Sequence, residues 1–345
     1  MLVVIFGAGA SFDSDYWRKC EGEWCPVLTD KLFDPEKYRY PLRLYPQCAP
    51  IAPQLQRLQE GETLEGRLDQ FQAEAEATYE RGYVELAAVR FYLRYLAWRW
   101  SNDSAERTSF VTNYSSLLGR LNRWRQKSQQ PICLITFNYD TILDDACRVS
   151  LGLRLDSIDA YTDNASGFQL LKLHGSWNWG RLVGDSEFSR RTGIDANDMI
   201  EAAPLLLRSL SEQFVLNSAL PEDSSSLVYP WGGSKLPAFP AIALPLRGKA
   251  SFECPKKQVD ALQHAIWNMT GLLVIGWRAQ EPHFLKEFAP RAGARIRGLI
   301  VTGSDEGASK VQARLEEAGI GAGFFRRGIG FRGFLATEDL EGFLA

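Results

Sequence analysis

Side chains that can do chemistry follow apolar runs at two places in the chain. His174 comes directly after the run LLKL at 170–173, and Asn138 and Asp140 come just after the run ICLIT at 132–136. An imidazole has an unperturbed pKa of about 6.5 and can act as a general base near neutral pH. An amide and a carboxylate can bind hydroxyl groups or stabilise a developing positive charge. Together these groups could hold a polar substrate and prepare a nucleophile.

Each of these side chains also has a purely structural explanation. A histidine at the end of an apolar run is often a packed core or capping residue. Asn and Asp often supply an Asx turn and a helix N-cap, which explains either Asn138 or Asp140 well and both together less well. The choice depends on whether other apolar runs end in the same way.

Five short apolar runs predict strands that are buried on both faces. They lie at 2–6, 132–136, 170–173, 272–275 and 298–302, and each is followed by small or polar residues. Helical patterns lie between them, at 141–149, 255–269 and 308–319. This alternation predicts an α/β fold with a Rossmann-like, doubly wound parallel sheet, in which ligands bind outside the carboxyl ends of the strands.

The 345 residues are predicted to form a single domain with two insertions. Residues 54–128 predict a helical insertion. A second insertion, at about 181–255, is polar and rich in proline. Within it we expect one helix at 204–215, and mostly loop at 227–255.

The first strand ends in GAGAS at residues 7–11, which is similar to a dinucleotide-binding turn. Gly7 and Gly9 allow a tight turn and close approach of a pyrophosphate, and the following helix N-terminus favours an anion. The third glycine of the usual motif is absent, because Phe12 stands there. Taken alone, this turn also fits an α/β domain that binds no nucleotide.

GAGAS, TFNYD (136–140) and KLHGS (172–176), in that order, resemble the sirtuin superfamily. More narrowly, they are similar to the zinc-less, sirtuin-like NAD hydrolases of bacterial anti-phage defence systems. The resemblance covers residues 2 to about 180, and more loosely the IGW and VTGS turns near the C-terminus. It implies an NAD glycohydrolase that releases nicotinamide and ADP-ribose, and that depletes NAD in antiviral defence.

By position, the resemblance implies that Asn138, His174 and Asp140 are catalytic. The residues that it implies for NAD binding are Gly7, Ala8, Gly9, Ala10, Ser11, Thr136, Gly175, Gly276, Trp277, Thr302, Gly303 and Ser304. The last three would lie near the adenosine end. His264 and His283 fall outside the motifs, and we expect their replacement to matter less.

Two departures from the sirtuin pattern argue against peptide deacylation. Deacylating sirtuins carry two CxxC pairs that hold a structural zinc, and this chain has no CxxC pair. They also have a Gly-Ile-Pro-Asp-Phe-Arg stretch where this chain has FDSDYWR. We therefore expect no metal, since the spacing of Cys20, Cys25, Cys48 and Cys254 argues against a zinc site. An NAD-dependent deacylase or ADP-ribosyltransferase, and a non-catalytic module that binds NAD or ADP-ribose, remain as alternatives.

The implied reaction needs little proton chemistry at the leaving group. Nicotinamide leaves NAD as a neutral molecule, so the main difficulty is an oxocarbenium-like centre on the ribose. Asn138 can bind the ribose hydroxyls or the attacking water. Asp140 can stabilise the cation or accept a hydrogen bond from the carboxamide, and His174 can act as base.

Composition restricts the partners. The net charge of −3 gives no sign of a surface for nucleic acid, and we expect neither direct nucleic-acid binding nor membrane insertion. Without a recognisable signal peptide, a cytoplasmic location is expected. The aromatic-rich segment 83–100 suits either a buried helix or a subunit contact, and we favour a homo-oligomer. The resemblance also implies a separate regulatory chain of the ATPase or Argonaute type.

Overall fold

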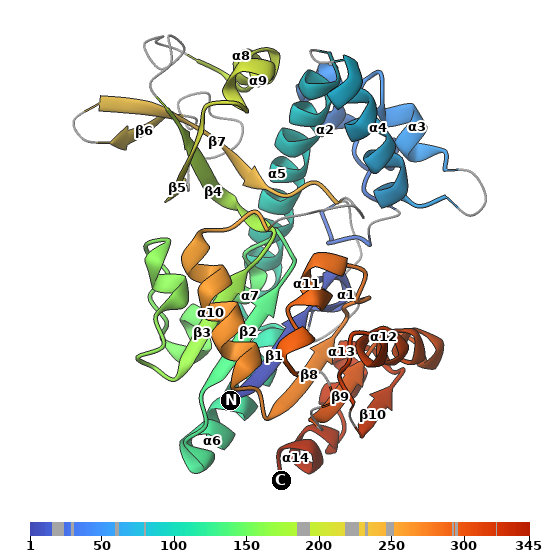
Figure 1. The fold of residues 1–345 in the computed structure, drawn as a ribbon, viewed down its shortest axis with the longest axis vertical. Helices are drawn as coiled ribbons and strands as arrows, with labels where there is room; N and C mark the ends of the chain where they lie inside the picture. The colour runs from blue at the N-terminus through green and yellow to red at the C-terminus, as the bar shows by residue number, and fades with distance from the viewer. Residues whose placement is uncertain are drawn as a thin grey trace.

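A computed structural model describes residues 1–15, 24–28, 31–58, 62–78, 81–184, 194–217, 228–231, 234–245, 252–291, 293, 296–321 and 323–345. At its centre is a six-stranded parallel sheet (Figure 1). The strands are β1 (Leu2–Phe6), β2 (Ile132–Thr136), β3 (Phe168–Lys172), β8 (Gly271–Ile275), β9 (Arg297–Val301) and β10 (Phe324–Arg327). Their spatial order is β10-β9-β8-β1-β2-β3. Numbered along the chain, this is the 3-2-1-4-5-6 order of the Rossmann-like folds, so the predicted fold class is confirmed.

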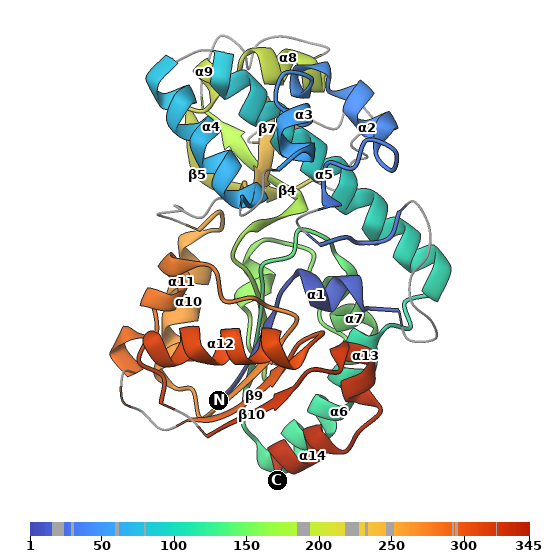
Figure 2. The ribbon, with the colours of Figure 1, turned by 90° about the vertical axis from the view of Figure 1, so that its right-hand side faces the viewer.

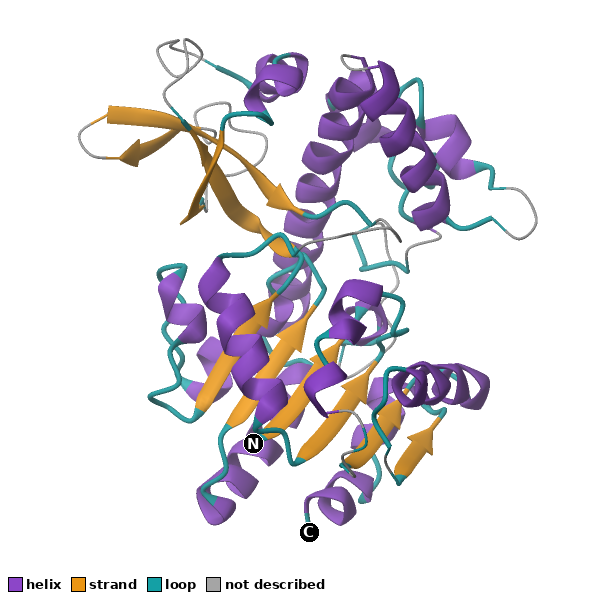
Figure 3. Cartoon of the chain, in the orientation of Figure 1, coloured by secondary structure: helices purple, strands orange, loops and turns teal. Residues whose placement is uncertain are grey.

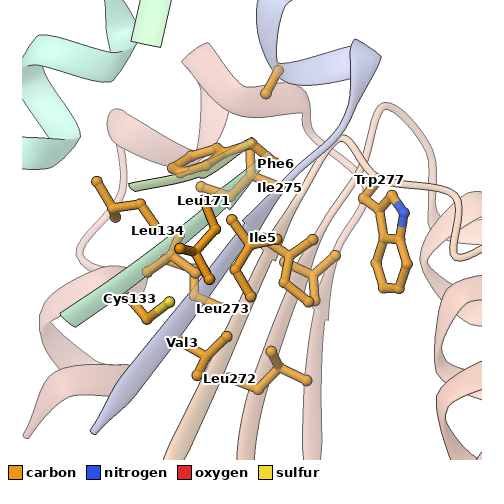
Figure 4. Close-up of a cluster of buried hydrophobic side chains, with 14 of the residues drawn as sticks. Val3, Ile5, Phe6, Cys133, Leu134, Leu171, Leu272, Leu273, Ile275 and Trp277 are labelled. Atoms are coloured by element: carbon orange, nitrogen blue, oxygen red, sulfur yellow. The ribbon is translucent and has the colours of Figure 1, made fainter. Parts of the chain in front are cut away.

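These strands form because most of their side chains are apolar on both faces. Every residue of β1, β2 and β3 is buried. Figure 4 shows side chains of β1, β2 and β8 packed together, with Trp277 beyond the end of β8. The five predicted strands are all present. The sixth, β10, was not predicted, because it is a partly exposed edge strand and lacks a long apolar run.

Helices cover both faces of this sheet, as Figure 2 shows. On one side lie α10 (Lys256–Trp267), α11 (Pro282–Lys286) and α12 (Asp305–Glu317). On the other side lie α6 (Asn113–Ser128), α7 (Ile142–Leu151), α13 (Gly330–Leu335) and α14 (Asp339–Leu344). The helices predicted at 141–149, 255–269 and 308–319 correspond to α7, α10 and α12.

A second group of elements lies beyond the carboxyl ends of the parallel strands (Figures 1 and 3). Its helices are α2 (Arg39–Leu44), α3 (Ala52–Gln56), α4 (Leu64–Thr78), α5 (Arg81–Thr108), α8 (Ala196–Glu201) and α9 (Ala203–Leu206). Its strands are β4 (Gly175–Val183), β5 (Leu210–Leu216), β6 (Val228–Trp231) and β7 (Ser234–Ile242), in the antiparallel order β5-β4-β7-β6. This group has its own apolar core around α5.

Two expectations for the second insertion are wrong. The helix expected at 204–215 is only the single turn α9, which a turn at 207–209 connects to the strand β5. Much of 227–255 was expected to be loop, but it forms β6 and β7. In both cases pairing with another strand overrides the local sequence preference. Pro240, for example, lies opposite Gly180 in the pairing of β7 with β4.

The long helix α5 is largely buried inside the chain. Its buried side chains include the aromatic residues Phe91, Tyr92, Tyr95, Trp98 and Trp100. They pack against residues of α2, α8 and the antiparallel sheet. These aromatic groups are therefore buried within the chain and do not form a surface for a second subunit. The homo-oligomer itself stays a prediction. None of the helices in the described residues has the length and apolar character that a membrane span requires.

Candidate active site

The strand order of the parallel sheet reverses between β1 and β8, and the turns after these two strands are in direct contact. The Gly7 amide donates to the Ile275 carbonyl (3.1 Å), and the Gly9 amide donates to the Gly276 carbonyl (3.0 Å). Gly276 has a φ of +62°, and a Cβ atom on it would lie 2.3 Å from the Ala10 nitrogen. Glycine is thus required by the packing of one turn on the other, independently of any ligand.

Gly276→Ala is therefore expected to lower the free energy of unfolding by more than about 2 kcal/mol, since a left-handed conformation and a backbone clash both oppose the methyl group. Urea unfolding measures this change. The matched control is Gly342→Ala in α14, where a Cβ atom meets nothing within 4 Å. That substitution should be neutral or stabilise by up to about 1 kcal/mol. Equal stability of the two variants would show that the turns are not locked together.

Asn138 lies in the turn after β2, and its side chain reaches across to the turn after β1. Its Nδ2 donates to the Gly7 carbonyl (3.0 Å) and to Ser11 Oγ (2.9 Å). Ser11 Oγ also lies 3.1 Å from the hydroxyl of Tyr114, which comes from α6. Both amide hydrogens of Asn138 are engaged in this way. The amide oxygen remains available to accept a hydrogen bond from a ligand, because no donor among the described residues reaches it.

Asp140 follows in the same turn and is only 5% exposed. One of its carboxylate oxygens, Oδ1, accepts from the Ile142 amide (3.2 Å) at the start of α7. Burial raises the pKa of Asp140 above its ordinary value, while the positive charge of Lys172 and a hydrogen bond from Ser11 oppose that rise. Because the net shift of the pKa is upward, ionisation of Asp140 lowers the stability of the fold.

Asp140→Asn is accordingly expected to raise the melting temperature at pH 7. The raised pKa means that Asp140 contributes most to stability when it is protonated, and that this contribution is lost as the pH rises through the folded-state pKa. Each unit of pKa elevation is worth about 1.4 kcal/mol. The asparagine oxygen can keep the bond to the Ile142 amide. Melting curves between pH 4 and 8 should show the advantage of the variant shrinking toward acid pH; a constant or reversed difference would contradict the assignment.

His174 lies where the parallel sheet gives way to the antiparallel one. The residue is 6% exposed, and its ring meets the Phe137 ring edge-on, with 4.8 Å between centroids. The next residue, Gly175, has a φ of +76°, and a Cβ atom there would lie 1.9 Å from the Ala241 carbonyl oxygen. The His174 carbonyl accepts from the Ala243 amide (3.0 Å), so β7 helps to fix the backbone of this turn.

A second histidine lies beside His174. The rings of His283 and His174 are stacked, with centroids 6.1 Å apart and planes at 23°. His283, at the second position of α11, is therefore unsuitable as a control, and the expectation that its replacement matters less stays a prediction. Only His264, which is exposed on α10, is distant enough to serve as a control.

An aromatic stack joins three of these strand ends. Phe137, after β2, stacks on Trp277, after β8, with centroids 5.5 Å apart and planes at 13°. Trp277 Nε1 donates to Glu281 Oε2 (2.7 Å), and Phe284 meets both rings edge-on. Since Phe137 also contacts His174, the stack restricts the relative positions of the turns after β2, β3 and β8.

A single cavity of about 1010 Å³ collects most of the residues that the sequence singled out. Those that line it are Gly7, Ala8, Gly9, Ser11, Asn138, Asp140, His174, Gly276, Trp277, Thr302, Gly303 and Ser304. Three others do not. Ala10 is packed against Gly276, and Gly175 forms the turn after His174. The Thr136 hydroxyl accepts a hydrogen bond from the backbone amide of Asn138 (3.1 Å). The cavity is at the upper end of the size range of small-molecule sites.

Two walls of the cavity were not foreseen. One is mainly apolar and includes Val27, Leu28, Leu32, Trp100 and Pro245. The other carries the basic residues Arg278, Arg314 and Arg332, which could bind phosphate oxygens, and Lys310, which forms an ion pair with Glu306 of the same lining. Arg278 directly follows the IGW turn, but no local pattern marks the other residues of these walls.

The described residues contain no cluster of three or more His, Cys, Asp or Glu side chains that could hold a metal ion. Of the four cysteines considered for zinc, Cys48 and Cys254 are buried in different apolar clusters. Cys20 lies outside the described residues.

Comparison with known proteins gives structural similarities only. No family model and no curated protein matches the chain. A mutant Sir2 homologue in complex with ADP-ribose is similar in structure, with 12% identity and a TM-score of 0.39, covering 92% of this chain and 91% of that chain. A Sir2 homologue in complex with NAD is similar too, with 14% identity and a TM-score of 0.38, covering 100% of this chain and 90% of that chain. At these TM-scores the similarities carry no argument of their own, and the fold assignment rests on the strand order.

Proposed function

We propose that this protein is an NAD glycohydrolase, which uses water to cleave NAD into nicotinamide and ADP-ribose. The observation that carries the proposal is the meeting of three side chains from two strand ends, Asn138, Asp140 and His174, in one cavity with the glycine turn at the strand-order reversal. Ligands of open α/β sheets bind at this location. The motif order of the sequence suggests NAD as the ligand.

The cavity offers suitable groups for each part of NAD. Its volume accommodates a dinucleotide-sized ligand, and the basic residues Arg278, Arg314 and Arg332 in its lining complement a pyrophosphate. The short helix α1 (Ala8–Phe12) begins directly after Gly7, and Ala8 is exposed to the cavity. Asn138, Asp140 and His174 lie together at the ends of β2 and β3, which suits the nicotinamide ribose.

In the proposed reaction the bond between ribose C1′ and the nicotinamide nitrogen breaks, and its electron pair leaves with neutral nicotinamide. Water adds to C1′, and His174 accepts the proton that the water loses. The Asn138 oxygen accepts a hydrogen bond from a ribose hydroxyl or from the water. The Asp140 carboxylate stabilises positive charge on the ribose in its ionised form, which the charge of Lys172 favours and burial opposes.

Purified protein incubated with NAD and no acylated peptide tests the proposal. Equal amounts of nicotinamide and ADP-ribose, measured by chromatography, are the expected result. Release of nicotinamide only when an acylated peptide is supplied would instead indicate a deacylase. Binding of ADP-ribose without any turnover would indicate a non-catalytic module.

We propose further that the activity serves antiviral defence and is controlled by assembly or by a separate ATPase- or Argonaute-type chain. Motif resemblance and the danger of an unrestrained NAD hydrolase to its own cell support this part of the proposal. The assay is therefore repeated with the product of the neighbouring gene, and light scattering gives the mass of the protein under both conditions. Full activity of a monomer without any partner would contradict this mode of control.

A further inference from the structure

The strand that leads to His174 contains a completely buried lysine. Lys172 is 0% exposed and lies between two leucines, in a setting typical of an apolar side chain. Its ammonium group donates to Asp144 Oδ2 at 2.8 Å and to the backbone carbonyl oxygen of Asp140 at 2.6 Å. A buried charge is tolerated only when it is paired and hydrogen-bonded, and both conditions hold here.

The partner carboxylate is equally buried and is bound from a third element. Asp144 lies in the first turn of α7 and is 0% exposed. Its Oδ1 accepts from the hydroxyl of Tyr161 at 2.7 Å. Tyr161 belongs to a 3₁₀ helix at Asp159–Thr162, and burial raises its pKa, which keeps the hydroxyl as a donor. We call Lys172, Asp144 and Tyr161 the buried triad.

The hydrogen bond from Lys172 to the Asp140 carbonyl joins two neighbouring strand ends of the candidate site. Asp140 belongs to the turn after β2 that also holds Asn138, while Lys172 lies two residues before His174. The ammonium group therefore ties the backbone of one turn to the strand that carries the other. Its charge also lowers the pKa of Asp140, and among the charged neighbours of Asp140 it has the largest effect.

Stability alone does not explain the triad. Replacing a buried ion pair by apolar side chains of similar size is often neutral or stabilising, whereas removing one partner is strongly destabilising. The residues on either side of Lys172, Leu171 and Leu173, are apolar and buried, so this position would accept such a residue. What an apolar residue could not supply is the hydrogen bond to the Asp140 carbonyl.

We infer that Lys172 is a positioning residue, which holds the turn of Asn138 and Asp140 in register with His174 through its bond to the Asp140 carbonyl. This inference rests on the proposed NAD cleavage for its kinetic consequence. The geometric part concerns the backbone of residues 137–141 and does not depend on any substrate.

The decisive variant removes the whole triad at once. Lys172→Met alone would leave Asp144 as an unpaired buried carboxylate and could unfold the protein. The triple variant Lys172→Met, Asp144→Leu and Tyr161→Phe removes both charges and the hydroxyl together. The matched control is Lys257→Met with Asp159→Leu, which removes an exposed lysine–aspartate pair with a 2.7 Å separation.

We expect the triple variant to stay folded, with kcat for NAD cleavage reduced about 100-fold and a smaller change in KM, since small misplacements of catalytic groups have effects of this size.

The acidic limb of the pH profile of the triple variant should move to higher pH. The groups around Asp140 are Lys172, Asp144, Tyr114, Ser11 and the Ile142 amide. Lys172 lowers the pKa of Asp140 more than Asp144 raises it. The loss of both residues therefore raises the pKa of Asp140 further. The control should match the wild type.

Hydrogen exchange supplies a readout that needs no activity. The amides of 137–141 should exchange at least about 10-fold faster in the triple variant, while those of β1 and β2 keep wild-type protection. Wild-type exchange at 137–141 in a folded triple variant, or unchanged kcat and pH profile, would overturn the inference. If the wild type itself releases no nicotinamide, the proposed function fails, and hydrogen exchange alone decides the inference.

Discussion

His174→Ala should lower the rate of nicotinamide release by about 100- to 10,000-fold, which is the usual effect of losing a positioned base. The imidazole lines the cavity at the end of β3, in contact with the ring of Phe137. The change removes no backbone contact, because the bond from Ala243 is made by the His174 carbonyl. The measurement is kcat and KM for NAD at several pH values, together with a melting curve.

His264→Ala is the control for this experiment, since His264 is exposed on α10 and does not line the cavity. Turnover within twofold of wild type is expected for that variant. His283→Ala is not a control, because the His283 ring stacks on His174; this variant tests whether that contact matters for turnover. If His174→Ala kept normal turnover and an unchanged melting temperature, the base would have to be another group.

The second large effect is expected for Asn138→Ala, with a loss of about 100-fold or more in kcat. The substitution removes the amide oxygen that we assign to the ribose or the water. It also removes the donor to the Gly7 carbonyl and Ser11 Oγ, which join the turns after β1 and β2. Because an unsatisfied buried group costs about 1–3 kcal/mol, a modest loss of stability should accompany the loss of activity.

Two further variants separate these contributions. Ser11→Ala removes one acceptor of the Asn138 amide but leaves the amide oxygen in place, so its effect on kcat should be smaller than that of Asn138→Ala. Asn164→Ala is the matched asparagine control, because this residue is exposed and far from the cavity. Equal kcat for Asn138→Ala and Asn164→Ala would rule out a role for Asn138 in the reaction.

The aromatic stack and the buried triad hold the turns that carry the catalytic candidates in fixed positions. Phe137, Trp277 and Phe284 pack at the ends of β2 and β8, and Lys172 ties the turn after β2 to β3. Catalytic groups act efficiently only when their own positions are fixed by packing and hydrogen bonds. The residues that fix these positions are as widely separated in the sequence as the catalytic candidates themselves.

The sequence by itself determined where five of the six parallel strands lie and which residues follow them. Strands buried on both faces must be continuously apolar, so runs such as 2–6 and 132–136 were visible without any structure. The polar residues Asn138, Asp140 and His174 were equally visible, because they interrupt these patterns at the strand ends. The edge strand β10 was not, since partial exposure leaves it no such run.

Only the tertiary structure decided which distant residues meet. Strand order places β1 beside β8, and this makes Gly276 a packing requirement of the turn at Gly9. Lys172 was visible as a charge in an apolar strand, but its partners Asp144 and Asp140 follow from the register of β3 against β2. The antiparallel sheet and the burial of α5 also depend on long-range pairing and packing. Local propensity describes single segments, whereas these contacts join segments whose proximity is fixed only when the whole chain has folded.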